Sequence, residues 1–245
     1  MLLSITGILL LGLCLGGLGG FLGTGGGTFA IPALVLAAGY DQKIAQGTAL
    51  VMVVTNVFKG LLKYKSQSGL DLKLAGMLAV SASFSSAFSS SWALSLPGLT
   101  LQKMYGTFLL GLAAFILVSR GRAAMADPLN PRWALLPGLA GGVSLGLFGV
   151  GGAMLAVPLL VLFHGQTQVR AQGLGLALAL PGCSISLAQY AHSGYIDWGV
   201  GALLALGGLA GVPYGVTWAH RVDETTLTRA FCLFLVIGGL ALLLK

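Results

Sequence analysis

The sequence predicts an all-α integral membrane protein that is built from two copies of one helical unit. Of its 245 residues, 56% are hydrophobic and only 8% are charged, whereas roughly a quarter of the residues in soluble domains are charged. The alternation of polar and apolar residues that a membrane barrel requires is missing, so the spanning segments are expected to be helices.

The internal repeat has a constant offset. Pro158 lies 126 residues after Pro32, and 19 of the 56 positions from Gly16 to Asp71 are identical to the residue at that offset. The register holds without insertion or deletion as far as Phe108, which corresponds to Phe234. Repeats of this size in an apolar chain are typical of transporters with two-fold pseudosymmetry, whose site lies where the copies meet.

Ten apolar segments follow one another along the chain, five in each copy. They lie near residues 2–22, 26–39, 44–62, 74–96 and 104–119, and near residues 133–149, 152–163, 171–191, 198–218 and 228–244. A helix needs about 20 residues to cross a bilayer, so the second segment of each copy is short. A glycine-rich run precedes it and should interrupt the helix, since glycine weakens helices and permits tight turns. The chain either reverses there or continues as one broken crossing.

The basic residues favour the reversal. If the chain reverses at both runs, Lys43, Lys103 and Lys245 lie on one face of the membrane and the other ten Lys and Arg residues lie on the opposite face. If it continues, the division is five against eight. Cytoplasmic loops carry the excess of Lys and Arg, so we expect both termini outside. Each copy then makes an odd number of crossings, which gives the two copies inverted topology.

Three parts make up the predicted domain organisation. They are a first membrane repeat, residues 1–119, a cytoplasmic linker, residues 120–132, and a second membrane repeat, residues 133–245. The linker, RGRAAMADPLNPR, is rich in charge and contains Pro128 and Pro131, which disfavour a helix across the junction. We expect each repeat to hold a glycine-rich broken or re-entrant hairpin and three further transmembrane helices.

The glycine-rich runs are candidate ligand sites. Reversal leaves the first amides of the following helix, those of residues 26–28 and 152–154, without intrahelical acceptors. These amides carry the positive end of a helix dipole and can bind an anion. Close helix packing is the alternative for glycines in membranes, and we favour it for Gly12, Gly16 and Gly20. The predicted lining residues are Thr24, Gly25, Gly26, Gly27 and Thr28 in the first copy and Gly151, Gly152 and Ala153 in the second.

Two glutamines at equivalent positions are the second candidate feature. Gln46 and Gln172 each stand in an Ala-Gln-Gly sequence just inside the third segment of their copy. A glutamine amide in lipid needs hydrogen-bond partners, and beside a glycine it could donate to a bound oxyanion. Thr48 and Asn56 extend this polar face in the first copy. Clasping of neighbouring helices by the glutamines, and bonding of Thr48 to a backbone carbonyl, are the structural alternatives.

The other residues argue against an enzyme, a cofactor or a metal site. The three cysteines and three histidines have no metal-ligand spacing, and no nucleotide-binding ending follows the glycine runs. All six acidic residues lie in loops or at segment ends, so no carboxylate is placed at mid-membrane to relay protons or coordinate sodium. The net charge of +7 does not indicate a nucleic-acid partner, because the basic residues cluster between apolar segments as topology signals.

Each copy contains a Gly-x-Gly-Gly run followed by Gly27 or Ala153, then a proline five residues later, and further on Ala-Gln-Gly. With this duplicated pattern the chain resembles the TauE/SafE family of sulfite and organosulfonate exporters. The likeness covers nearly the whole chain. It implies a multi-pass carrier of small sulfur-containing or related organic anions in the inner membrane. The second copy departs from the first at Val150 and Ala153, which correspond to Thr24 and Gly27.

The sequence therefore predicts a secondary transporter that exports small anions such as sulfite or sulfonates by alternating access. Its expected partners are the anion and the lipid bilayer. An anion-selective channel or passive pore is the main alternative, and a membrane scaffold without transport is a third. The substrate, the direction and coupling ion of transport, and the oligomeric state, a homo-oligomer included, stay open.

Overall fold

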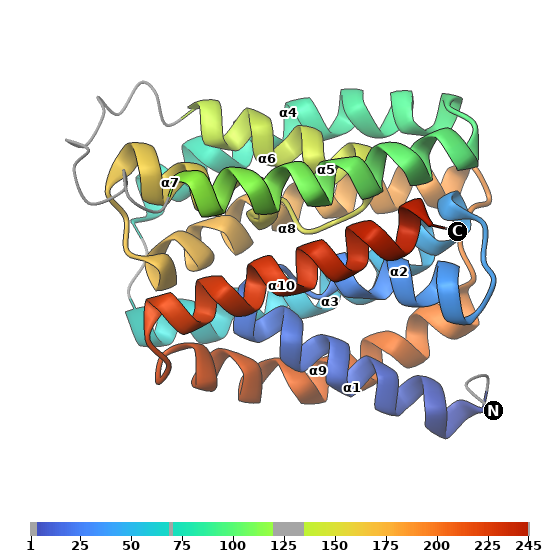
Figure 1. The fold of residues 1–245 in the computed structure, drawn as a ribbon, viewed down its shortest axis with the longest axis horizontal. Coiled ribbons are helices and arrows are strands. Elements are labelled where there is room, and N and C mark those ends of the chain that lie inside the picture. Colours follow the sequence, from blue (N-terminus) through green and yellow to red (C-terminus); the bar gives the residue numbers. More distant parts are fainter. Residues whose placement is uncertain (1–3, 69–70, 120–134, 245) are drawn as a thin grey trace.

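The described part of the chain, residues 4–68, 71–119 and 135–244 of a computed structural model, consists of ten α-helices and contains no strand (Figure 1). The predicted linker, residues 120–132, lies outside these ranges. The helices are α1 (Ile5–Leu22), α2 (Gly27–Ala37), α3 (Gln42–Ser68), α4 (Leu72–Ser95), α5 (Gly98–Ser119), α6 (Leu135–Phe148), α7 (Ala153–His164), α8 (Gln168–His192), α9 (Trp198–Ala219) and α10 (Glu224–Leu243). The all-helical prediction is confirmed.

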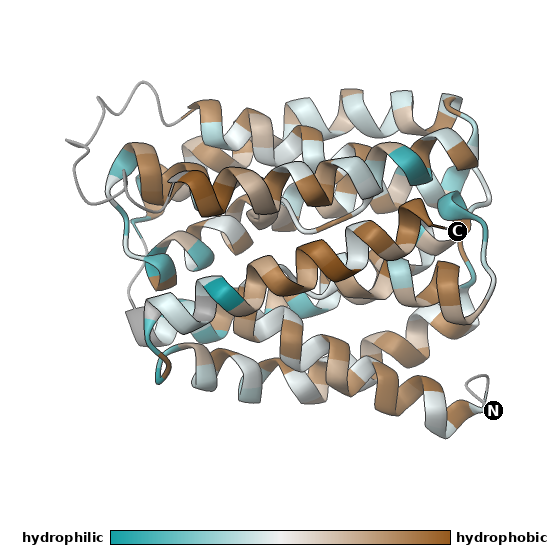
Figure 2. Cartoon of the chain, in the orientation of Figure 1, coloured by the Kyte–Doolittle hydropathy of each residue, from teal (hydrophilic) through white to brown (hydrophobic). Residues whose placement is uncertain are grey.

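The composition of the helices is that of a membrane protein. Among the described residues, α1, α3, α4, α5, α8 and α9 are long and apolar enough to cross a bilayer, and the other four are shorter apolar helices. Polar residues gather at the two ends of the bundle (Figure 2). Large apolar side chains also face outward, for example Phe84 and Phe88 of α4, which are 79% and 76% exposed. Exposure of such an apolar surface to water is unfavourable, whereas contact of the same surface with lipid chains is not.

Each glycine-rich run joins two helices that lie side by side. Ala37 and Ala38, at the end of α2, line the same small apolar hollow as Ile8 and Leu11, near the start of α1. The short helix α2 therefore runs back along α1. In Figure 1, α1 begins and α10 ends at one end of the bundle, whereas α5 ends and α6 begins at the opposite end.

Helices of one copy pack on helices of the other. The most extensive contact is between α1 and α9, and the equivalent contact, between α6 and α4, is the second most extensive. Glycines allow the close approach, as expected for Gly12, Gly16 and Gly20. A Cβ added at Gly12 would lie 2.5 Å from the carbonyl oxygen of Leu204, and one at Gly20 would lie 2.6 Å from that of Val212. The interface between copies is thus a zipper of small residues, which suits helices that have no hydrophobic drive to associate in lipid.

The α4–α6 interface replaces glycines by serines on one side. Ser85 and Ser89 of α4 correspond to Gly211 and Gly215 of α9 in the repeat. The Ser85 hydroxyl donates to the carbonyl oxygen of Leu139 on α6 (3.0 Å), and that of Ser89 donates to the carbonyl oxygen of Gly142 (3.3 Å). These bonds satisfy the hydroxyls where water is absent.

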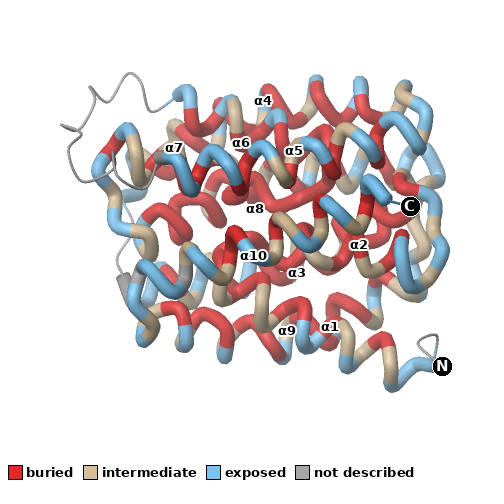
Figure 3. The backbone as a smooth tube through the Cα atoms, viewed as in Figure 1, coloured by how far each residue is buried: buried red, intermediate tan, exposed pale blue. Residues whose placement is uncertain are grey.

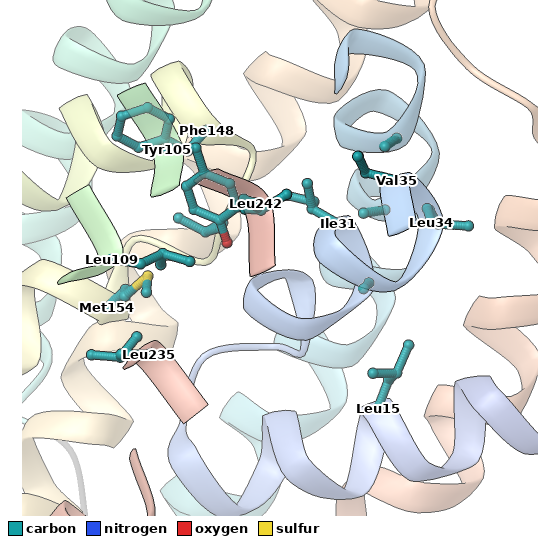
Figure 4. Close-up of a cluster of buried hydrophobic side chains, with 14 of the residues drawn as sticks. Leu15, Ile31, Leu34, Val35, Tyr105, Leu109, Phe148, Met154, Leu235 and Leu242 are labelled. Carbon is teal, nitrogen blue, oxygen red and sulfur yellow. The ribbon is translucent and has the colours of Figure 1, made fainter. Parts of the chain in front are cut away.

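The centre of the bundle contains the two equivalent helices α3 and α8, which touch each other and are the most deeply buried of the candidate spans (Figure 3). Around them, buried side chains from both copies form one apolar cluster (Figure 4). In it, Ile31 of α2, Tyr105 of α5, Phe148 of α6 and Met154 of α7 lie together beside the glycine-rich turns. Both turns are therefore enclosed by protein and held away from the surface.

Candidate functional site at the two glycine-rich turns

The first turn needs glycine for its backbone conformation. Gly23, which ends α1, has φ of 68°, and Gly25 and Gly26 have φ of 72° and 92°. Side chains disfavour this left-handed region, whereas glycine enters it freely. In the second turn Gly149 has φ of 67°, but Gly152 has φ of −56° and begins α7 in a right-handed conformation. The two turns are therefore equivalent in sequence and different in detail.

The two turns touch each other. A Cβ added at Gly151 would collide with the carbonyl oxygen of Thr24, and one added at Gly27 would lie 3.0 Å from the carbonyl oxygen of Gly149. The Oγ1 atom of Thr28 lies 3.7 Å from the Sδ atom of Met154, which is the residue equivalent to it at the 126-residue offset. The lining residues predicted in the two copies thus lie in one region, at the point where equivalent residues meet.

Each predicted glutamine is held by a tyrosine of the other copy. The Tyr64 hydroxyl donates to Oε1 of Gln172 (2.7 Å), and the Tyr190 hydroxyl donates to Oε1 of Gln46 (2.6 Å). A Cβ added at Gly23 would lie 2.6 Å from Cβ of Gln172, and one added at Gly149 would lie 3.3 Å from Cβ of Gln46. Each glutamine therefore lies against the turn of the opposite copy. Each glutamine thus both joins helices α3 and α8 through its hydrogen bond to a tyrosine and forms part of the turn region.

Several buried polar atoms at the turns lack a partner in the described structure. They are Oγ1 of Thr24, Nε2 of Gln46 and Oδ1 of Asn56, on side chains that are at most 1% exposed. Asn56 also touches the first turn, because its Nδ2 donates to the carbonyl oxygen of Gly25 (3.2 Å). No side chain caps the first turn of α2 or of α7. Native proteins leave few such groups unsatisfied, so these three atoms are available to hydrogen-bond a polar ligand at the turns.

Comparison with known proteins identifies the family. The family model described as "Sulfite exporter TauE/SafE" matches residues 8–242, which is most of the chain. The chain belongs to the TauE/SafE family. Similar curated proteins are a "Probable membrane transporter protein" of Xylella fastidiosa (strain 9a5c), 27% identical over 90% of this chain and 89% of the relative, and two from Bacillus subtilis (strain 168). YdhB is 23% identical over 99% of this chain and 100% of its own length, and YjnA is 27% identical over 96% and 98%. No solved structure matches.

The family and the names of these relatives show that this TauE/SafE protein is a transmembrane transporter. Its function therefore requires a site and a route through the helices. Among the residues that the structure describes, no group of three His, Cys, Asp or Glu side chains could hold a metal ion.

Two details of the site differ from the expectation drawn from the sequence. The amide of Met154 donates to the carbonyl oxygen of Gly151 (3.0 Å), so of the three amides expected to be free in the second copy, that of Met154 is occupied. Thr48 is buried, but its hydroxyl accepts a hydrogen bond from the amide of Asp197 (3.0 Å) in the loop before α9. Thr48 therefore holds a loop, whereas Gly25, Gly26, Gly152 and Ala153 lie buried at the turns themselves.

Tyr64 and Tyr190 are site residues that were not predicted from the sequence. The signal was present, because the two tyrosines are identical residues at the 126-residue offset. Tyr64 lies 18 positions after Gln46 on the same helix, and the repeat alone does not reveal that each tyrosine reaches the glutamine of the other copy.

Proposed function

We propose that this TauE/SafE protein is a secondary transporter that exports small sulfur-containing or related organic anions across the inner membrane by alternating access. Its binding site lies where the two glycine-rich turns meet. Sulfite and short alkylsulfonates represent the substrate class.

The observation that carries this proposal is the set of buried polar atoms without partners at the turns. An unsatisfied buried donor or acceptor costs about 1–3 kcal/mol, so a ligand that bonds to several of them recovers a substantial free energy. The atoms belong to one small region, since Thr24 is in the first turn, Asn56 bonds to that turn and Gln46 lies against the second turn.

The chemistry of the region favours an anion. Nε2 of Gln46 can only donate, the Thr24 hydroxyl can donate, and the starts of α2 and α7 present the positive ends of two helix dipoles. Oδ1 of Asn56 is an acceptor and cannot bond to a sulfonate oxygen, so its donor is a water molecule or an O–H group of the ligand. Neutral donors and dipoles bind an anion without a buried cation, which lets the anion leave again.

The arrangement of the copies supports inverted repeats that rock around this site. α1 and its counterpart α6 begin at opposite ends of the bundle, and the contact of α1 with α9 has its equivalent in the contact of α6 with α4 (Figure 1). Inverted repeats of this kind can exchange two conformations that open the same site to opposite faces. Export of an anion needs no coupled cation, because an inside-negative potential favours its exit by roughly 2.3 kcal/mol per charge per 100 mV.

The test is transport by the purified protein in proteoliposomes. A panel of sulfite, methanesulfonate, butanesulfonate, sulfate and acetate is supplied at increasing concentration. We expect saturable flux of the sulfur anions, and accelerated exchange when a sulfur anion is present on the opposite side. Flux that rises linearly without counterflow would establish the channel alternative, and absence of flux for the whole panel would contradict both.

A substitution at Gln46 tests the location of the site by ligand binding, without the transport assay. Gln46→Leu keeps the helix and removes the amide donor, so sulfite should no longer raise the thermal stability of the variant, because a ligand stabilises only a form that binds it. Unchanged stabilisation of Gln46→Leu by sulfite would place the site elsewhere.

A further inference from the structure

Only one pair of equivalent positions in the repeat has a basic residue, Lys or Arg, in both copies. Lys103 of α5 corresponds to Arg229 of α10, and every other Lys or Arg with a counterpart at the 126-residue offset has a residue without that charge there. The preceding residues match as well. Both basic residues follow a Thr-Leu pair after one intervening residue, Thr100-Leu101 in the first copy and Thr226-Leu227 in the second. Topology signals need not be placed symmetrically, so a cation kept in both copies calls for a role that both copies share.

Lys103 stands over a hollow in the side of the bundle. The hollow has a volume of about 500 Å³ and is lined by Thr100, Lys103, Met104, Thr107, Phe108 and Phe148. Thr100, Lys103 and Thr107 lie on one face of α5 and are exposed. Within the described residues, Lys103 forms no ion pair or hydrogen bond. An unpaired ammonium group between two hydroxyls provides the partners that an acid group would need.

The floor of the hollow adjoins the glycine-rich turns. The Phe148 ring stacks on Phe108, with 4.9 Å between centroids, and on Tyr105, with 5.2 Å. Phe148 is the residue directly before Gly149 of the second turn, and the Tyr105 hydroxyl donates to the carbonyl oxygen of Thr28 beside the first turn (3.2 Å). The aromatic rings at the floor of the hollow are therefore in direct contact with residues of both turns.

We propose that Lys103, with Thr100 and Thr107, forms an anion-capture site that passes the organic anion to the turns from the face where α5 begins, and that Arg229 is its counterpart on the opposite face. This inference rests on the proposed transport function. The acid group lies at Lys103, and a short apolar chain lies on Phe108 and Phe148, so alkylsulfonates fit better than sulfite. The phosphate group of a lipid could bind Lys103 in the same way, and the experiment below distinguishes lipid binding from substrate binding.

The test measures butanesulfonate uptake in right-side-out and inside-out membrane vesicles, which present opposite faces to the substrate. Lys103→Gln should raise KM about threefold to fivefold in one vesicle orientation, as expected for an exposed charge pair, with kcat unchanged. Arg229→Gln should do so in the other orientation. Lys103→Arg should restore the KM, and Lys73→Gln, which removes an exposed charge at the start of α4, should leave it unchanged.

The outcomes separate this inference from the function on which it rests. If Gln46→Leu abolishes uptake while Lys103→Gln leaves KM unchanged in both orientations, the transporter stands and the capture site is wrong. A lipid site is detected in proteoliposomes: if phosphatidylglycerol raises the thermal stability of the wild type but not of Lys103→Gln, and KM is unchanged, the hollow binds lipid and the proposal is overturned.

Discussion

The Tyr190 hydroxyl donates to Oε1 of Gln46 across the boundary between the two copies, at a distance of 2.6 Å. Because Oε1 accepts this bond, the Nε2 group of Gln46 is turned away from the tyrosine, and it has no partner of its own in the described structure. The tyrosine thus fixes which end of the amide is offered to a ligand. Tyr64 orients Gln172 in the same way in the other copy, but there Nε2 donates to the carbonyl oxygen of Phe21 (3.5 Å) and is not left without a partner.

Tyr190→Phe should weaken anion binding. The change removes only the hydroxyl, so Oε1 of Gln46 loses its donor and the amide is free to turn over. A buried acceptor left without a partner costs about 1–3 kcal/mol of folding free energy, and the stabilisation by sulfite in a thermal-shift assay should shrink. Tyr214→Phe is the control, because Tyr214 is 73% exposed on α9. An equal response of the two variants would contradict the role given to Tyr190.

Gly151→Ala should disturb the contact between the turns. The added Cβ would collide with the backbone carbonyl of Thr24, and a backbone group cannot rotate away as a side chain can. We expect loss of transport and a lower melting temperature. Gly111→Ala is the matched control, since nothing lies within 4 Å of a Cβ at this helical position in α5. Wild-type transport by Gly151→Ala would show that the close approach of the turns is not required.

Gly16→Leu should open the zipper between α1 and α9. A Cβ at Gly16 would collide with the backbone of Gly208, so the helices must move apart and lose their close contacts. Forcing extra atoms into a packed interface typically costs about 1–3 kcal/mol, seen as a fall in thermal stability in detergent. Gly76→Leu on α4, where a Cβ meets nothing within 4 Å, should have little effect.

Stability should depend on pH through Asp197. The amide of Val200 and the hydroxyl of Tyr40 (2.7 Å) donate to its carboxylate and hold the pKa of Asp197 below its usual value, against a smaller opposing effect of burial. Because the folded pKa is depressed, the stabilisation is present above the unfolded pKa of about 3.9 and is lost as pH falls through the folded pKa. In the Asp197→Asn variant the melting temperature should depend less on pH in this acid range than in the wild type. An unchanged pH dependence would show that Asp197 is not its cause.

Cysteines at Ser95 and Arg221 test the inversion of the copies. These residues are equivalent at the 126-residue offset and both are exposed, at the end of α4 and just after α9. In a background with Cys14, Cys183 and Cys232 replaced by Ala, a membrane-impermeant maleimide should label Ser95→Cys and Arg221→Cys from opposite sides of the membrane. Labelling of both from one side would refute inverted topology.

Most of the secondary structure could be predicted from the sequence. The ten apolar segments agree with the ten described helices, and the short second segments became α2 and α7, because hydropathy and glycine breaks are local properties of the chain. The glycine-rich turns and the two glutamines could be proposed as a common region because the repeat implies that equivalent residues meet. The role of Thr48 could not be predicted in this way, because its hydroxyl accepts a hydrogen bond from the amide of Asp197, 149 residues away in the chain.

By itself the amino-acid sequence determined the membrane class, the duplication and the positions where the helices break, since each follows from composition or from spacing along the chain. The tertiary structure alone decided which helices of the two copies pack together, that each glutamine is held by the tyrosine of the other copy, and that Met154 uses its amide within the second turn. These features depend on contacts between residues far apart in the chain, where a displacement of one ångström makes or breaks a hydrogen bond, and no local pattern records them.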